Sequence, residues 1–259
     1  MSAEIIEKQG KAMQLAGLDA LIALSPENVT YTAGLVVPSQ SLMRWRHAGC
    51  IVTAGGQLSM IVIDMEETTV KKLAAIEKVR VYREFVDDPM DTLADLLTEL
   101  KLDRARIGIE MDFIPARDFQ TLARRLPQAR FTAAQNLFHR LREIKTAAEI
   151  ELLRKLSKLT DNAIGNTLKQ ARAGMTEMDL AGVLTSGIFA GGAENFKLMI
   201  VASGERSQYP NVGPTRRALK EGDLIRMEIF GILTGIMQGS AARRLSAARR
   251  PSKKRSGRI

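Results

Sequence analysis

The chain has 259 residues, of which 45% are hydrophobic and 26% charged, so it is long enough for one or two globular domains and is not disordered throughout. A single cysteine, Cys50, excludes an internal disulfide and a cysteine-built zinc site, and it fits a reducing, cytoplasmic setting. Acidic residues interrupt the N-terminal helical pattern, and no uncharged stretch could span a bilayer, so we expect neither a secretory signal nor a membrane anchor.

The formal net charge of +9 is concentrated near the end of the sequence. Residues 240–259 are rich in Lys and Arg and contain no acidic residue, whereas residues 1–239 are close to neutral. Such a block of like charges predicts a solvated, disordered tail that contacts polyanions weakly and without specificity. No groove-reading motif accompanies it, so specific recognition of nucleic acid is not expected.

In the first half of the chain, short apolar strands alternate with helical patterns. The pair Ser25-Pro26 predicts a helix start, since Ser caps free N–H groups and Pro at the first helical position loses no needed donor. Residues 54–57 read as a hairpin turn between two strands. We predict helices over residues 3–17, 66–76, 89–101 and 115–126, and strands over residues 18–24, 49–53, 58–63, 79–84, 106–110 and 130–133. This alternation predicts an α/β domain with a mixed sheet and helices on both faces.

The second half begins with a long amphipathic helix, predicted over residues 146–172. Thr176 caps a second helix, with Asp179 close to its positive end. Strands are predicted over residues 196–202 and 224–231, which gives an α+β unit. The sequence therefore divides into residues 1–138, residues 139–239 and the basic tail 240–259.

Five stretches, in this order and spacing, resemble the creatinase / aminopeptidase P / prolidase family of Xaa-Pro peptidase-like proteins. They are GLDALIALSPENVTYTAG at 17–34, LREIKTAAEIELLRKLSKLTDNAI at 141–164, GMTEMD at 174–179, and IVASG at 200–204 followed by KEGDLI at 220–225. The resemblance implies a creatinase-like N-terminal domain followed by an incomplete α+β domain of the pita-bread fold, and a hydrolase as the family activity. In the metal-dependent members, two divalent ions (Mn, Co or Zn), held by two Asp, two Glu and one His, activate a bridging water. Creatinase relies on His without a metal.

Few of these family positions keep their chemistry in this sequence. The substrate-side His falls on Asn211, whose amide cannot take up a proton near neutral pH. The first Asp ligand aligns with Glu228 and the second with Gly239, which has no side chain; the other ligands would lie in the basic segment beyond it. We therefore expect no metal and no other cofactor in this chain, and only Asn211 and Glu228 remain as catalytic candidates.

Both candidates, and both histidines, also have a purely structural interpretation. Glu228 is either a remnant ligand that faces a pocket or a surface residue of a strand, paired with Arg226. Asn211 lies among Pro and Gly and suits a turn. His47 and His139 precede the catalytic half, so we interpret them as structural or surface residues.

The C-terminal segment departs from the strand with an Arg-Thr pair that the resemblance leads us to expect after Gly235, and this departure suggests a shifted reading frame. Residues 236–251 can be encoded by a series of codons that, with one base added before it, reads as a family-like strand with an Arg-Thr pair. We therefore expect that a single-nucleotide deletion, or a sequencing error, truncated a longer gene. Three functions remain open: an inactive member of the Xaa-Pro peptidase/creatinase hydrolases, a non-catalytic binding or dimerisation module whose N-terminal domain forms a homodimer, and weak polyanion binding through residues 240–259.

Overall fold

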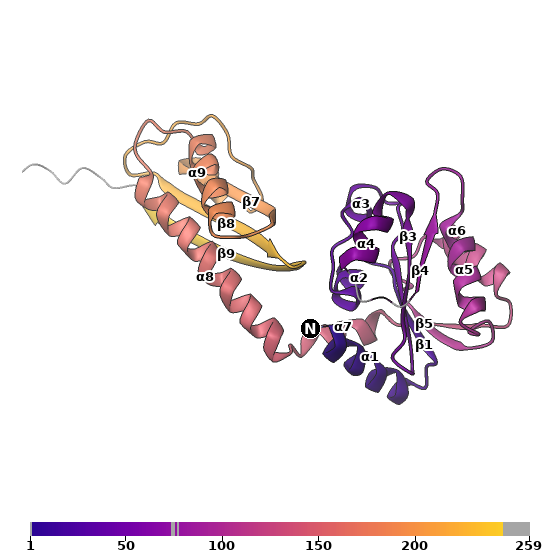
Figure 1. Ribbon diagram of the computed structural model, residues 1–259. Coiled ribbons are helices and arrows are strands. Elements are labelled where there is room, and N and C mark those ends of the chain that lie inside the picture. Colours follow the sequence, from indigo (N-terminus) through magenta and orange to yellow (C-terminus); the bar gives the residue numbers. More distant parts are fainter. Residues whose placement is uncertain (1, 74–75, 77, 246–259) are drawn as a thin grey trace, which may run out of the picture. The chain divides into compact units, whose positions relative to one another are not determined.

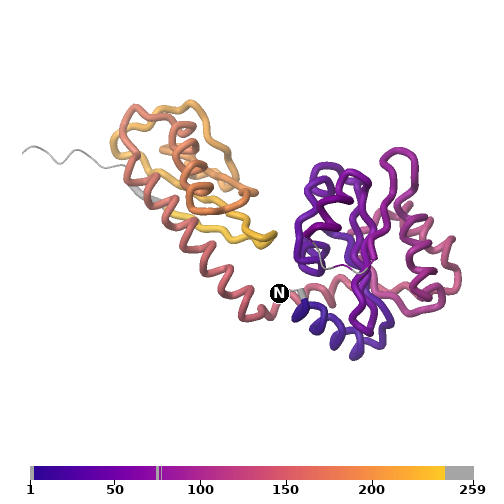
Figure 2. Tube along the Cα trace, in the orientation of Figure 1, coloured from indigo at the N-terminus to yellow at the C-terminus, as the bar shows by residue number. Residues whose placement is uncertain are grey.

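The computed structural model describes residues 2–73, 76 and 78–245, and the chain divides into two compact units between Ala148 and Glu149 (Figures 1 and 2). The first unit is built on a six-stranded sheet in the order β4-β3-β2-β1-β5-β6. Its strands are β1 (Ala20–Ala23), β2 (Gly49–Thr53), β3 (Leu58–Ile63), β4 (Lys78–Tyr82), β5 (Arg106–Ile109) and β6 (Arg130–Ala133). The β2–β3 hairpin and the β1–β2 pair are antiparallel, and the other neighbours are parallel, so the sheet is mixed, as predicted.

Helices cover both faces of this sheet. They are α1 (Ser2–Ala16), α2 (Pro26–Ala33), α3 (Pro38–Leu42), α4 (Glu67–Leu73), α5 (Pro89–Glu99), α6 (Ala116–Arg125) and α7 (Gln135–Glu143). The alternating side chains of β1 enter a hydrophobic core on each face of the sheet. Leu21 and Ala23 belong to one core with α1, α2 and α7, whereas Ala20 and Ile22 belong to a second core with α5 and α6. The predicted α/β arrangement is confirmed.

The start of α2 is fixed by two oxygen-bearing side chains. The hydroxyl of Ser25 accepts a hydrogen bond from the Asn28 N–H at 3.2 Å, which confirms the predicted cap. The buried carboxylate of Glu110, which follows β5, accepts from the N–H groups of Leu24 (2.6 Å) and Ser25 (2.9 Å) and from Nδ2 of Asn28 (2.6 Å). Glu110 therefore links the central strands to the positive end of α2.

Helix α7 extends the first unit beyond residue 138, where the sequence placed the boundary. The side chain of Phe138 is fully buried in the core beside α1 and α2. At the end of α7, Nζ of Lys8 donates to the carbonyls of Leu141 and Ile144, and the Tyr31 hydroxyl donates to the Leu141 carbonyl at 3.1 Å. These contacts hold the segment after residue 138 against the first unit.

The second unit is a three-stranded antiparallel sheet with two helices on one face. Its elements are α8 (Ala147–Gln170), α9 (Glu177–Ala190), β7 (Asn195–Ser203), the short 3₁₀ helix η2 (Gly204–Gln208), β8 (Leu224–Leu233) and β9 (Ile236–Leu245). The strand order is β7-β8-β9, and the core lies between the sheet and the helices. Thr176 caps α9 and forms a reciprocal capping box with Asp179.

Strand β9 corrects one prediction. We expected residues 240–245 in a disordered tail, but they form the second half of β9 and pair with Leu224–Ile229 of β8. These residues form a strand despite their basic composition because β8 offers them a complete set of backbone partners. A tight turn at Thr234-Gly235, where both residues have positive φ, brings them alongside β8. The rest of the predicted tail, residues 246–259, lies outside the described residues.

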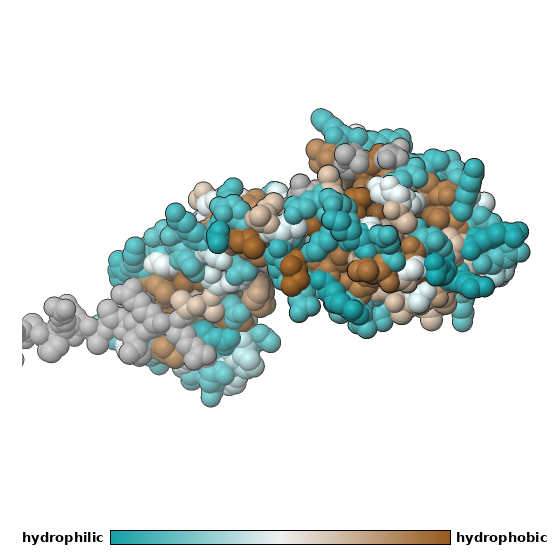
Figure 3. Space-filling model, turned by 90° about the horizontal axis from the view of Figure 1, so that it is seen from below, coloured by the Kyte–Doolittle hydropathy of each residue, from teal (hydrophilic) through white to brown (hydrophobic). Residues whose placement is uncertain are grey.

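No helix among the described residues is long and apolar enough to cross a membrane. Polar and charged side chains cover most of the face seen in Figure 3, and the apolar areas on it are separate. Scattered apolar side chains of this kind are ordinary on a protein surface.

Candidate functional site

Glu228 and Gly239, two of the sequence-predicted site positions, lie on the face of the second sheet that α8 and α9 do not cover. Side chains of β8 alternate strictly, and Ile225, Met227 and Ile229 are buried beneath the helices. Arg226, Glu228 and Phe230 therefore point to the opposite face, which we call the outer face. Gly239 and Ala241 lie on the same face, because they pair with Phe230 and Glu228 across the β8–β9 ladder.

Glu228 occupies the position of the first metal ligand and has a cationic neighbour. Its carboxylate lies 3.4 Å from Nη2 of Arg226, and its side chain is 23% exposed. The same guanidinium donates to the carbonyls of Tyr209 (2.6 Å) and Pro210 (2.7 Å). Arg226 therefore places a positive charge beside the carboxylate of Glu228.

Gly239, at the position of the second ligand, is covered by an aromatic ring. A Cβ atom at this residue would lie 2.5 Å from Cε1, 2.7 Å from Cδ1 and 2.9 Å from Cζ of Phe230. Side-chain atoms do not approach each other so closely. The ring of Phe230 therefore fills the space into which any ligand side chain at residue 239 would project.

Asn211 lies in the irregular segment between η2 and β8. It is exposed, and it directly follows the two carbonyls that Arg226 holds. The structure thus brings the segment that carries Asn211 to the outer face beside the Arg226–Glu228 pair.

Neither histidine belongs to the outer face, since both lie in the first unit. His47 is buried, and its Nε2 lies 2.8 Å from the Asp118 carboxylate, while its own carbonyl accepts from the Tyr82 hydroxyl at 2.8 Å. His139 lies on the exposed side of α7. His47 thus connects elements of the first unit, and His139 is a surface residue.

Sequence reasoning missed Glu177, the first residue of α9. Its carboxylate has no exposed surface and accepts hydrogen bonds from Ser203, Thr215 and Arg206. Burial alone would raise its pKa, but the hydrogen bonds from Thr215 and Ser203 outweigh burial and hold the pKa below the ordinary value for Glu. The signal in the sequence that could have found Glu177 is its position directly after Thr176, the residue that caps α9.

A second charged cluster lies beside Glu177 and was also missed. Arg217 forms a bidentate pair with Glu205 (2.8 and 2.7 Å) and contacts Asp223 at 2.6 Å. The hydrogen bonds from Arg217 lower the pKa of Glu205 to about 2 and that of Asp223 below its ordinary value. Residue 204 needs to be glycine for two reasons. Its φ is +52°, and a Cβ there would lie 2.3 Å from Nη2 of Arg217, so a side chain would displace the guanidinium.

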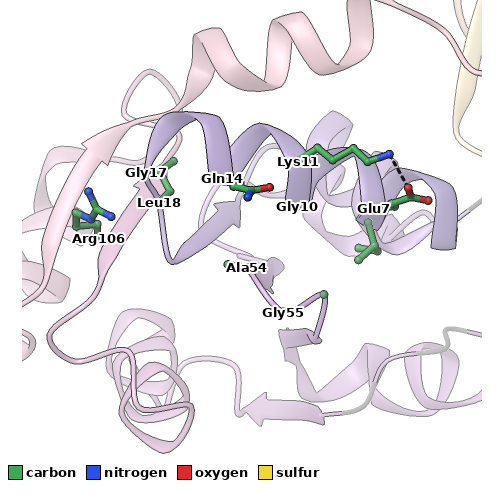
Figure 4. Close-up of a pocket in the computed structure, with 11 residues that line it drawn as sticks. Glu7, Gly10, Lys11, Gln14, Gly17, Leu18, Ala54, Gly55 and Arg106 are labelled. Carbon is green, nitrogen blue, oxygen red and sulfur yellow. Dashed lines mark hydrogen bonds and ion pairs between the residues drawn. The ribbon is translucent and has the colours of Figure 1, made fainter.

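A surface pocket of about 640 Å³ lies in the first unit, between α1 and the β2–β3 turn (Figure 4). Lys11 on its rim is paired with Glu7 at 2.6 Å, and Arg106 lies at its other end. The pocket contains none of the predicted site residues, and its charged side chains are largely exposed.

The residues on the outer face do not fit the metal centre that the resemblance implies. Two bridged cations need several carboxylates, which neutralise the charge and place the ions. Here the first position is paired with Arg226, and the second is covered by Phe230. Among residues 2–73, 76 and 78–245, no three His, Cys, Asp or Glu side chains gather as a metal site would require.

Comparison with known proteins matches both units. The model of the creatinase/prolidase N-terminal domain matches residues 6–144, and the model of metallopeptidase family M24 matches residues 151–242. A probable dipeptidase, PepE, of Mycobacterium bovis is 27% identical over 218 residues, which are 83% of this chain and 56% of that protein. The Xaa-Pro dipeptidase of Pyrococcus furiosus is 23% identical over 229 residues, 87% of this chain and 60% of its own length. The chain thus spans less than two thirds of these relatives.

Solved structures share the fold at low sequence identity. The X-Pro aminopeptidase of Thermotoga maritima superposes with a TM-score of 0.79 at 20% identity, over 92% of this chain and 64% of its own. The prolidase of Pyrococcus furiosus gives a TM-score of 0.74 at 21% identity, over 92% of this chain and 69% of its own. From its two matched domains, the chain belongs to the creatinase / aminopeptidase P / prolidase family, with that family's N-terminal domain followed by part of its pita-bread peptidase domain.

Proposed function

We propose that this chain is a member of the Xaa-Pro peptidase-type hydrolases that does not itself catalyse metal-dependent hydrolysis. The observation that carries the proposal is the Phe230 ring over Gly239, since it fills the second ligand position. Arg226, 3.4 Å from the carboxylate of Glu228, adds a cation at the first position. In this chemistry, adjacent divalent cations lower the pKa of a water molecule so that it forms hydroxide at neutral pH. These side chains do not form a site that would bind such cations.

A second candidate function is a binding or dimerisation module. The first unit supports it, because its sheet is covered on both faces and its two cores contain fully buried side chains such as Ile22 and Phe138. A domain of this kind can recognise a partner whatever the state of the outer face.

The buried thiol of Cys50 agrees with a reducing cytoplasm as the place of action.

The test is hydrolysis of Xaa-Pro dipeptides by the purified full chain with Mn²⁺ or Co²⁺. We expect no turnover above the metal-only blank, and no difference between the wild type and Glu228→Gln. Glu221→Gln, an exposed residue before β8, is the matched control. Turnover that a chelator abolishes, and that Glu228→Gln but not Glu221→Gln removes, would overturn the proposal.

Two further measurements separate the alternatives. Light scattering that gives twice the chain mass supports the homodimer, and a monomer at all concentrations counts against it. Polyanion binding through the basic segment predicts salt-sensitive binding of DNA that disappears when residues 246–259, which lie beyond β9, are deleted.

A further inference from the structure

The carboxylate of Glu177 joins three segments of the second unit. Oε1 accepts from the backbone N–H of Ser203 at 2.7 Å and from its hydroxyl at 2.8 Å. Oε2 accepts from the N–H (3.0 Å) and hydroxyl (2.7 Å) of Thr215 and from Nε of Arg206 (3.1 Å). The end of β7, η2 and the chain at residue 215 therefore meet at one side chain of α9.

Backbone hydrogen bonds extend this meeting point along the first turn of α9. The N–H of Glu177 donates to the carbonyl of Arg217 at 3.1 Å, and that of Met178 donates to the carbonyl of Thr215 at 3.0 Å. An isolated bridge pairs Thr176 with Ala218. The segment before β8 thus supplies the acceptors that the N-terminus of a helix lacks.

The hydroxyl of Ser203 connects Glu177 to the neighbouring cluster. It donates to Glu177 and accepts from Nη1 of Arg217 at 2.9 Å. Arg217 in turn holds Glu205 and Asp223. Residues 204–223 are therefore fixed near both of their ends by one continuous network.

Between its two anchors, Arg206 and Thr215, the chain passes over the outer face. The carbonyls of Tyr209 and Pro210 accept from Arg226, which also lies 3.4 Å from Glu228. The position of Asn211, one residue further on, is therefore set by contacts on both sides of it.

We propose that Glu177 is the positioning residue of the loop 204–216, which it holds over the outer face of β8 through its carboxylate. A carboxylate suits this place better than an amide, because each of its oxygens accepts from a backbone N–H, which can only donate. The amide of Gln would direct its own N–H groups at the donors of Ser203 or at those of Thr215. The proposal rests on these contacts alone and holds whether or not the protein hydrolyses peptides.

The test compares the full-length wild type with Glu177→Gln by amide hydrogen exchange. Hydrogen bonds to a charged group are the stronger ones, so we expect exchange at residues 205–215 to accelerate about ten- to one-hundredfold. Amides in the first unit and in β8 should exchange at wild-type rates. Glu205→Gln is the matched control: it removes an exposed partner of Arg217 but leaves Glu177 and its donors in place, so residue 215 should stay protected.

A second readout follows the acceptor itself. In the wild type, the amide proton signals of Ser203 and Thr215 should shift together as Glu177 is protonated, at a pH below the ordinary range for Glu; in Glu177→Gln this shift should be absent. Arg206 is the charged group that faces the carboxylate directly. Arg217 reaches it through the hydroxyl of Ser203 and in turn holds Glu205 and Asp223. Asp179, also on α9, bonds to Thr176. Unchanged exchange in the loop of Glu177→Gln, or equal acceleration throughout the second unit, would overturn the proposal.

Discussion

The ring of Phe230 over Gly239 gives the most direct prediction, because it reverses the sign of a simple substitution. The backbone at Gly239 is not left-handed, so on an open strand Gly→Ala would stabilise by about 0.5–1 kcal/mol. Here the new methyl would lie 2.5 Å from Cε1 of Phe230, and such overpacking costs about 1–3 kcal/mol. We therefore expect Gly239→Ala to destabilise the β8–β9 hairpin by a net amount of about 0.5–2 kcal/mol.

A double-mutant cycle isolates the contact. In a Phe230→Ala background the ring is gone, so adding Gly239→Ala should restore stability by about 0.5–1 kcal/mol. Exchange of the β8 and β9 amides and urea unfolding followed by circular dichroism measure each step. Gly165→Ala on α8 is the matched control: a Cβ there meets nothing within 4 Å, and it should stabilise by about 0.5–1 kcal/mol. The reasoning fails if Gly239→Ala is as stable as wild type and Phe230→Ala leaves its effect unchanged.

Two predictions concern the first unit. Glu110→Ala leaves the N–H groups of Leu24 and Ser25 and the amide of Asn28 without their buried acceptor, so urea unfolding should show a loss of about 2–5 kcal/mol; a loss under about 1 kcal/mol would contradict the role of Glu110. Burial raises the pKa of the Cys50 thiol to about 12, so at pH 8 only about one thiol in ten thousand is ionised. A thiol reagent should therefore label Cys50 only after unfolding in urea, and rapid labelling of the native chain would contradict this.

Local signals in the sequence were sufficient for the elements whose ends are fixed by their own residues. Ser25 before Pro26 predicted the start of α2, and Thr176 with Asp179 predicted the start of α9, because a cap acts within one helical turn. The alternation of β8 likewise separates buried Met227 from Glu228 on the outer face.

The remaining features depend on partners that are distant in the sequence. Residues 240–245 read as a basic tail because their strand pairing is set by β8 and not by their composition. Phe230 covers Gly239 only because the strand register places the two opposite each other. Glu177 gains its five donors from residues 26 to 38 positions away, and no local pattern shows that they meet.

The bonds from Lys8 to the end of α7 tie the first helix of the chain to the last part of the first unit. A product translated from the internal Met13 would lose Lys8, and with it the buried Ile5 and Gln9. The carbonyls of Leu141 and Ile144 would lose their cation, and the core that α1 shares with α2 and α7 would lose most of α1. We expect cellular proteases to remove such a shortened product quickly, so that only chains started upstream of Lys8 accumulate.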